Sequence, residues 1–287
     1  MSAIFRHEMR RAFQSLPAYL FCAFFLIFVG IGAVYYNIQA AVANFEYVLQ
    51  FVCIGMAVLI PVLTMRSLAE ERRQKTDQLL YSLPLKTTDI VLGKYFALTA
   101  VFLLPVCIIA VYPLVFSQYG EVYFPSAYGS LLAFFLMGAA LIAVGEFLSS
   151  LTENQGVAAG ISIAVMLFNY YSVSLAEQVS SSAFGALAAL VVIAVLLALL
   201  VRALTRSDAI AVGAGAALAV IALGIYFLDG SLLENLLPNI MQSLSLFERF
   251  YMFVDGVFDL RSIVFFLSVI AFFLFLTVQS LEKRRYN

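Results

Sequence analysis

The sequence predicts an all-α polytopic membrane protein, and composition, uncharged runs and charge placement all support this fold class. Hydrophobic residues make up 64% of the 287 residues and charged residues 11%, against about 25% charged residues in a typical soluble domain. Eight stretches without a charged residue are each long enough for the roughly 20 residues that a helix needs to cross a bilayer. We therefore predict a single transmembrane domain over residues 1–287 with about eight spans.

The predicted span cores are uninterrupted apolar runs separated by short polar or charged connections. In chain order they are Ala18–Tyr36, Val48–Met65, Tyr95–Phe116, Tyr128–Gly145, Gly156–Leu175, Phe184–Val201, Ala209–Leu228 and Ser262–Leu281. The first run is longer than the roughly 7–15 residues of a signal-peptide core. This length favours an uncleaved first span over a signal cleaved near Ala41-Val42-Ala43.

Basic residues are concentrated on one side of the predicted topology, which sets its orientation. Eight spans place both termini on the same side, together with 14 of the 16 Lys and Arg residues. These are Arg6, Arg10, Arg11, Arg66, Arg72, Arg73, Lys75, Lys86, Lys94, Arg202, Arg206, Lys283, Arg284 and Arg285. Because cytoplasmic loops carry the excess of basic residues, we expect both termini in the cytoplasm.

Residues 1–16 have the pattern of an amphipathic helix. Phe5, Met9 and Phe13 repeat at helical spacing on one face, and Arg6 and Arg10 repeat on another. Such a helix lies on the membrane surface. Two compatible interpretations follow: a simple anchor for the first span, or an elbow helix that also packs beside the segment Arg66–Lys94.

The segment Arg66–Lys94 carries ten of the 33 charged residues between two long apolar runs. Nothing from Ser67 to Leu83 interrupts a helix, and opposite charges four residues apart, such as Glu71 with Lys75, support one. Over Glu70–Gln78 this helix is polar all round, so it has no apolar stripe to bury in its own core. We predict that it projects into the cytoplasm.

Pro84 ends this predicted helix, because proline disfavours a helical conformation at the residue before it. Thr87 or Thr88 can then cap a second, short helix with Asp89 in its first turn. The whole segment 66–94 is thus predicted to be a cytoplasmic helix–turn–helix after the second span.

Two further connections have recognisable patterns. In the inner loop after the fourth span, Ser150 and Glu153 have the spacing of a capping box, which predicts a new helix start. The outer segment 229–261 contains Pro238 and two short apolar patches, which predicts a pair of short helices at, or dipping into, the outer interface.

Several chemical functions lack their residues in this sequence. The only histidine is His7, which excludes His-based zinc sites and His-dependent triads, and there is no GxxxxGK[ST] nucleotide-binding motif. Glu146 and Glu153 come nearest to intramembrane coupling groups, and we interpret both as inner-interface residues rather than buried coupling sites. The cysteines are interpreted as small buried hydrophobes, not as a disulfide or metal site. They are Cys22, Cys53 and Cys107.

Three segments, in order along the chain, resemble a known family. They are Glu70-Glu71-Arg72-Arg73 followed by Thr76, Leu79-Leu80, Leu83-Pro84 and Gly93-Lys94-Tyr95; Ser149-Ser150-Leu151-Thr152-Glu153-Asn154-Gln155; and Phe247-Glu248-Arg249-Phe250 with Asp255-Gly256-Val257-Phe258-Asp259. The chain resembles the membrane subunits of ABC-2-type ATP-binding cassette transporters, of the gliding-motility and nitrous-oxide-reductase-maturation type. In that family the first segment carries the coupling helix that fits a groove in the ATPase.

The sequence departs from the family pattern at two places. Glycine usually precedes the threonine at position 76, where this chain has Lys75, so the helix is expected to run on uninterrupted. Family members typically have six spans, and the extra pair predicted here lies within residues 184–228.

The resemblance implies a permease subunit and not an enzyme, and family analogy favours export over import. A separate ATPase, in two copies, would bind ATP and Mg, and this chain would hold no cofactor. It also implies a second permease copy, as homodimer or heterodimer, an auxiliary extracytoplasmic subunit, and the inner membrane of a bacterium, with no nucleic-acid partner. The expected ATPase contacts are Glu70, Glu71, Arg72, Arg73, Gln78, Leu79, Leu83, Pro84, Leu85 and Lys86, with a secondary inner-loop contact at Thr152, Glu153 and Asn154.

Alternative interpretations remain open. The segment 66–94 could be a solvated loop whose charges only set topology. The chain could also be a membrane scaffold or assembly protein that recruits cytoplasmic partners without transport. An interior without charged residues suits an amphipathic, lipid-linked or polymeric substrate better than a small ion.

Overall fold

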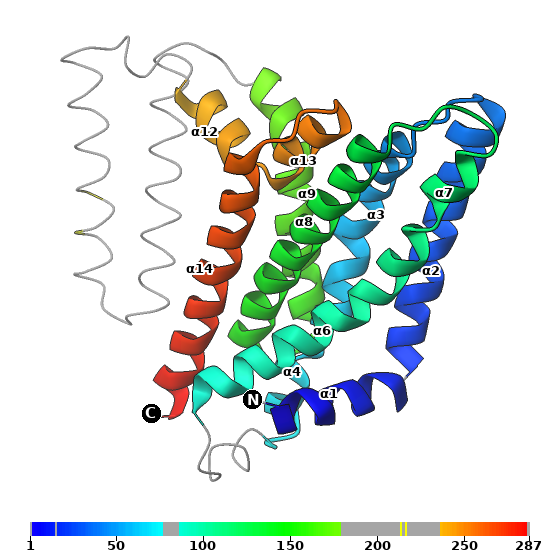
Figure 1. Ribbon diagram of the computed structural model, residues 1–287. Helices are drawn as coiled ribbons and strands as arrows, with labels where there is room; N and C mark the ends of the chain where they lie inside the picture. The colour runs from blue at the N-terminus through cyan, green and yellow to red at the C-terminus, as the bar shows by residue number, and fades with distance from the viewer. Residues whose placement is uncertain are drawn as a thin grey trace. The chain divides into compact units, whose positions relative to one another are not determined.

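The computed structural model describes residues 2–14, 16–76, 86–178, 213, 216 and 236–285, and the regular structure within these ranges is helical (Figure 1). The chain divides into two compact units, which we describe separately. The first comprises Met1–Tyr170 and Leu246–Asn287, and the second comprises Tyr171–Ser245.

Six described helical segments are long and apolar enough to cross a membrane. They are Leu16–Gln39, Glu46–Arg73, Thr87–Phe116, Phe124–Leu151, Gln155–Ala176 and Leu260–Arg284. These segments contain six of the eight predicted span cores. The other two predicted cores, Phe184–Val201 and Ala209–Leu228, lie outside the described residues, so the expected extra pair of spans remains a prediction.

The spans of the first unit pack as neighbouring helices with both chain ends at one end of the bundle, which we call the terminal end (Figure 1). Helix α14 (Leu260–Arg285) lies along α8 (Phe124–Leu151), and α3 (Glu46–Thr64) lies between α8 and α2 (Leu16–Gly32). Helix α6 (Thr87–Ile109) contacts α8, α14 and α2. Helix α8 is therefore the central element of this unit.

An aromatic core joins four elements of the first unit. The rings of Phe25 on α2, Phe102 on α6 and Phe134 on α8 lie 5.7–6.3 Å from one another, and all three side chains are fully buried. Phe250 on α13 (Leu246–Val254) extends the cluster with a 5.7 Å contact to Phe134. Gly138 on α8 lets Phe102 pack directly against the helix backbone.

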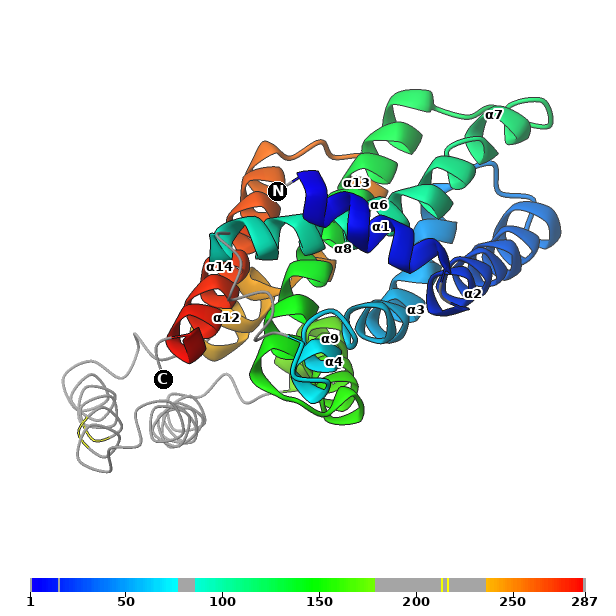
Figure 2. The same ribbon diagram turned by 90° about the horizontal axis from the view of Figure 1, so that it is seen from below.

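The predicted N-terminal helix is present as α1 (Ser2–Gln14), which lies across the terminal end and packs on α6 and α2 (Figure 2). Its contact with α6 is close enough that a side chain on Gly93 would meet Ile4. This packing supports the elbow interpretation over a simple anchor.

Two spans contain breaks near the end of the bundle opposite the termini. The first continues from α2 into a π-helical turn over Ala33–Gln39, and the third is interrupted at Ala110 before α7 (Tyr112–Phe116). By contrast, the third span is continuous at its other end. As predicted, a helix begins at Thr87 with Asp89 in its first turn, and it continues as α6 through Lys94 into the third span; the N-cap position is occupied by Lys86, not by Thr87 or Thr88.

Short helices also occupy the described part of the segment 229–261, as predicted. Helix α12 (Leu236–Leu244) belongs to the second unit, and α13 belongs to the first. Gly256 has a φ of +79°, and Val257 N–H donates to the Met252 carbonyl at 3.0 Å, so the chain turns after α13. Asp259 then caps α14 by accepting from Arg261 N–H and Ser262 N–H at 3.0 and 3.1 Å.

Candidate functional site

Lys94 lies at the centre of a buried group of charged side chains at the terminal end. Its Nζ donates to Glu71 Oε1 at 2.5 Å, to Glu8 Oε1 at 2.9 Å and to the Ser67 carbonyl at 3.1 Å. The side chain is only 2% exposed. Because a buried ammonium is stable only when its donors are satisfied, these three acceptors explain how a lysine occupies the interior of a membrane protein.

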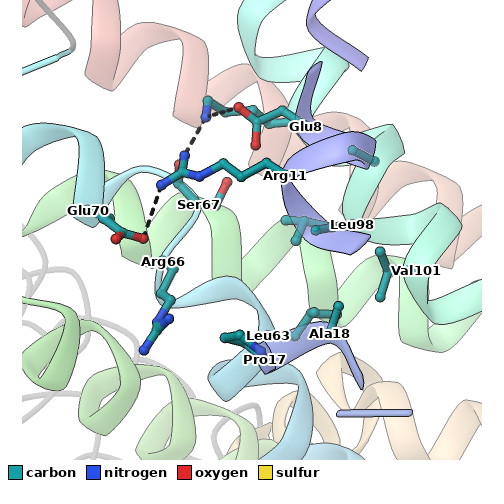
Figure 3. Close-up of a pocket in the computed structure, with 13 residues that line it drawn as sticks. Glu8, Arg11, Pro17, Ala18, Leu63, Arg66, Ser67, Glu70, Leu98 and Val101 are labelled. Atoms are coloured by element: carbon teal, nitrogen blue, oxygen red, sulfur yellow. Dashed lines mark hydrogen bonds and ion pairs between the residues drawn. The ribbon is translucent and has the colours of Figure 1, made fainter. Parts of the chain in front are cut away.

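Arg11 extends this group of charges along α1. Its guanidinium lies 3.2 Å from a Glu70 oxygen (Figure 3). It also lies 3.7 Å from Glu71 Oε1. We call Glu8, Arg11, Glu70, Glu71 and Lys94 the Lys94 cluster. It contains two cations and three carboxylates, and it connects α1, α4 (Ala69–Arg73) and α6.

The chain turns sharply after α4, and this corrects the prediction of an unbroken helix over Ser67–Leu83. Lys75 has a φ of +57°, Lys75 N–H donates to the Arg72 carbonyl, and Thr76 N–H donates to the Glu71 carbonyl at 3.0 Å. This is the hydrogen-bond pattern of a Schellman motif, which ends a helix. Lys75 thus adopts the left-handed conformation that glycine would favour at this position, and the expected uninterrupted helix is wrong.

The short helix α4 is also attached to α8. Ser149 Oγ accepts hydrogen bonds from Leu68 N–H at 3.3 Å and Ala69 N–H at 3.2 Å, and it donates to the Met65 carbonyl at 3.2 Å. Ser149 therefore satisfies backbone donors at the start of α4 that have no partner within the helix. Through Lys94 and Ser149, α4 is connected to both α6 and α8.

Glu146 is completely buried on α8, which contradicts its interpretation as an interface residue. Both carboxylate oxygens lack a hydrogen-bond partner within the described part of the chain. The neighbouring Gly145 packs against Thr64 of α3, so the helices approach closely here. Glu153, in contrast, is exposed and lies 3.3 Å from Arg284, as an interface residue would.

The expected ATPase contacts fall into three groups. Glu71 and Arg72 are buried within the chain, and Glu70 is partly covered by Arg11. Arg73 and Lys86 are exposed. The remaining expected contacts lie outside the described residues: Gln78, Leu79, Leu83, Pro84 and Leu85. The polar surface predicted over Glu70–Gln78 is thus partly an internal surface.

The secondary inner loop is compact and lies beside the end of α14. Asn154 Oδ1 accepts from Gly156 N–H at 2.9 Å and so caps α9 (Gln155–Gln178). The predicted capping box is wrong, because Ser150 instead donates to Ser280 Oγ on α14 at 3.1 Å. Thr152 Oγ1 accepts from Asn154 N–H at 3.2 Å, so the three expected contact residues belong to one turn.

A cavity of about 170 Å³ adjoins the Lys94 cluster (Figure 3). Charged lining comes from Glu8, Arg11, Glu70, Lys94 and Arg66. The apolar wall comes from α2, α3 and α6, with Pro17, Ala18, Leu63, Leu98 and Val101. The cavity is therefore amphipathic, with charges on one side and hydrocarbon on the other.

Sequence reasoning did not identify the central role of Lys94 or its pairing with Glu8. The two residues are 86 positions apart, so no local spacing connects them. One signal was available: Lys94 lies among the apolar residues Ile90–Phe102, where an unpaired ammonium would be costly. Such a lysine requires a carboxylate partner from another element.

These features define a class of protein: an all-helical, multi-pass membrane protein whose charged, membrane-flanking segment is attached to its spans by buried ion pairs. The comparison with protein families identifies this class more closely. The sequence model described as ABC-2 family transporter protein matches residues 2–182, more than half of the chain. The chain belongs to this family of transporter membrane proteins. A comparison with curated proteins finds no match.

Family membership also limits the chemistry of the chain. ABC-2 permeases generally work with an ABC ATPase and do not bind the nucleotide themselves. The matched range 2–182 includes α1, α4 and α6, so the Lys94 cluster lies wholly within the family region.

Proposed function

We propose that this chain is the membrane-spanning permease subunit of an ATP-binding cassette transporter driven by a separate ATPase. Family membership is the observation that carries the proposal. In this proposal the terminal end of the bundle faces the cytoplasm of a bacterium, because it bears most of the basic residues. The ATPase, in two copies, binds there and supplies ATP and Mg.

The ATPase contact is proposed at residues 77–86 together with Arg73. Arg73, which precedes this stretch, and Lys86, which is its last residue, are exposed. Glu71 and Arg72 are buried, so we assign them to the attachment of α4 rather than to the partner surface. The turn at Thr152, Glu153 and Asn154 is the proposed secondary contact.

The Lys94 cluster is proposed to transmit movement from this contact to the spans. A displacement of α4 acts on α6 through the Glu71–Lys94 pair and on α1 through Arg11. The Ser149 hydrogen bonds attach the same helix to α8. ATP drives transport in this scheme only because the closed ATPase dimer favours one arrangement of these helices over another.

The test combines copurification with two leucine substitutions. The tagged chain, extracted from its native membrane in mild detergent, is expected to retain a stoichiometric ATP-binding cassette protein, identified by mass spectrometry. In the double variant Leu79→Ser, Leu83→Ser, we expect normal expression but loss of permease-dependent ATPase stimulation. Leu151→Ser, at an exposed leucine of the same end, is the control. Normal stimulation in the double variant would contradict the proposed contact.

The second candidate function is a membrane scaffold that recruits cytoplasmic proteins without transport. The exposed Arg73 and Lys86 suit a recruitment surface equally well. Nucleotide-dependent conformational change distinguishes the two functions, because a scaffold has no reason to rearrange its spans when a partner binds ATP. A chain that repeatedly purifies alone would favour the scaffold.

The substrate class is proposed from the apolar character of the spans. We propose an amphipathic, lipid-linked or polymeric substrate that is exported, with two permease copies forming the pathway as a homodimer or heterodimer. An auxiliary extracytoplasmic subunit of the gliding-motility type would supply recognition outside the membrane. Proteins that copurify with the chain test each of these assignments.

A further inference from the structure

The buried carboxyl group of Glu146 takes no part in the connections between helices described above. The residue lies in α8, is completely inaccessible to solvent, and neither of its carboxyl oxygens has a hydrogen-bond partner in the described part of the chain. An ionised carboxylate buried in this way costs far more free energy than the neutral acid, because the charge loses its hydration and gains no partner. Glu146 therefore carries a proton in this arrangement of the helices.

The packing of α6 against α8 places Glu146 at the same depth as Lys94. The two helices run in opposite directions (Figure 1), and Phe102 of α6 packs on Gly138 of α8. Lys94 precedes Phe102 by eight residues, and Glu146 follows Gly138 by eight residues. Eight residues advance a helix by about 12 Å and return to nearly the same face. Lys94 is accordingly close enough to act electrostatically on Glu146.

Glu146 also lies beside the attachment of α4 to α8. Ser149 is three residues further along α8, so the two side chains are neighbours on the surface of the helix. The Ser149 hydroxyl accepts from the Leu68 and Ala69 N–H groups at the start of α4. Glu146 is thus enclosed between α6, which carries Lys94, and the start of α4, which carries Glu71.

Charged and titratable groups surround Glu146 from three elements. They are Lys94 and Tyr95 of α6, Glu71 and Arg72 of α4, and Glu8 of α1. Helix α3 contributes the uncharged Thr64 beside Gly145, and the charged residues of α14 lie at its two ends. Because Glu71 and Glu8 already neutralise Lys94, a third carboxylate gains little from this ammonium and is repelled by its two carboxylate partners.

We propose that Glu146 is a proton-binding site and an alternative partner of Lys94. When Glu71 moves away from Lys94, the carboxylic acid of Glu146 releases its proton to water, and the resulting carboxylate accepts a hydrogen bond from the Lys94 ammonium. When Glu71 returns, Glu146 takes up a proton again. One proton is therefore released and bound for each displacement and return of α4, and Lys94 keeps an anionic partner throughout.

The cavity beside Lys94 provides a route for the proton. It is lined by Lys94 and by the exposed Arg66, and its volume is about 170 Å³. A water molecule occupies roughly 30 Å³ in the liquid, so the cavity can hold the water that accepts the proton. The displacement of α4 rests on the proposed function, whereas the protonation of Glu146 and its dependence on Glu71 do not.

Infrared spectroscopy of the chain in mixed micelles at neutral pH tests the protonation directly. The carbonyl band of a protonated carboxylic acid is separate from the bands of an ionised carboxylate. We expect the wild-type protein to show such a band and the Glu146→Gln variant to lack it.

Removal of a carboxylate that neutralises Lys94 should remove the proton from Glu146. A nearby opposite charge without its own partner changes the ratio of ionised to neutral carboxyl by about tenfold or more, so Glu71→Gln should lose most of the band. Glu8→Gln should reduce it in the same way, and it keeps the test decisive should Glu71→Gln fail to fold. Glu70→Gln is the matched control and should retain the band, because Glu70 pairs with Arg11 rather than with Lys94.

Unfolding in the same micelles gives an independent measurement. Glu146→Gln should be tolerated in the wild-type background but should cause a further loss of stability in the Glu71→Gln background, because it removes the carboxylate that replaces Glu71. A buried residue that only fills space would be tolerated equally in both backgrounds.

Three results would overturn the proposal. If Glu146→Gln removes no protonated-acid band, Glu146 is ionised. If the band is unchanged in Glu71→Gln and in Glu8→Gln, Glu146 is permanently neutral. If Glu146→Gln has the same effect on stability in both backgrounds, it does not replace Glu71. None of these measurements includes the ATPase, so failure of the proton site and failure of the proposed transport function are distinguishable.

Discussion

The aromatic core and the Lys94 cluster both hold helices of the first unit together, but by different means. The core brings α2, α6, α8 and α13 together through fully buried phenylalanine rings. The cluster brings α1, α4 and α6 together through ion pairs and hydrogen bonds. Phenylalanines can be exchanged for other apolar side chains of similar volume, whereas each charge in the cluster requires its partner.

This difference shows that the Lys94 cluster carries a cost in free energy, the burial of charge, that apolar residues at the same positions would avoid. Well-packed apolar residues often replace a buried ion pair without loss of stability, so burial of charge is poorly explained by stability alone. The cluster lies where the segment 66–94 meets the spans, which is the place where the proposed function requires a defined connection. Four predictions test this contrast, from the largest expected effect to the smallest.

Replacing Lys94 with methionine should cause the largest loss of stability. Lys94→Met leaves Glu8 and Glu71 without their buried cation, and removing one partner of a buried pair typically costs about 3–5 kcal/mol. Unfolding of the purified protein in mixed micelles measures the change. Lys75→Met is the matched control, because Lys75 is exposed. A similar, small effect of both substitutions would mean that the buried ion pairs contribute little.

Gly138→Ala should cause a smaller loss, from the apolar side of the comparison. An added methyl group would collide with Phe102 and Met56, and overpacking of a core costs about 1–3 kcal/mol. Gly160→Ala is the control, since nothing lies within 4 Å of that position. The same unfolding assay should show a loss for the first variant only. Equal stability of the two variants would contradict the close packing of α8 against α6.

Glu146→Gln should have little effect on stability or increase it. The carboxylate is fully buried without a hydrogen-bond partner in the described ranges, so a neutral side chain of the same shape removes a potential buried charge and breaks no described hydrogen bond. Glu71→Gln, which weakens the bonds to Lys94, should be clearly destabilising. If Glu146→Gln destabilises as much as Glu71→Gln, then Glu146 has an essential partner.

Replacing Asp259, the cap of α14, should cause the smallest loss of stability, and this loss should depend on pH. Hydrogen bonds from the Ser262 hydroxyl and from Arg261 N–H lower the pKa of Asp259 below its ordinary value. A lowered folded-state pKa means that the ionised carboxylate stabilises the fold above the unfolded-state pKa of about 3.9. This contribution is lost as the pH falls through the folded-state pKa. The stability difference between the wild-type protein and Asp259→Asn should therefore shrink below about pH 4. A difference that stays constant with pH would contradict the cap.

The long apolar runs were sufficient to predict the six described spans, because their length exceeds what any soluble element needs. Local patterns also predicted α1 and the short helices before α14. The turn at Lys75 was missed because a left-handed lysine has no sequence signal, unlike glycine. The Lys94–Glu8 pair was missed because it depends on how α1 packs on α6. Tertiary contacts between distant residues decide the site, and periodicity does not report them.

The central claim is that Lys94 and Glu71 form one energetic unit that connects α4 to α6, and a double-mutant cycle tests it most directly. Unfolding free energies are measured for the wild-type protein, Lys94→Met, Glu71→Gln and the double variant. We predict that the double variant is more stable than the sum of the single losses implies, with a coupling energy of about 1–3 kcal/mol. Additive losses would contradict the claim, because they would mean that the two side chains act independently.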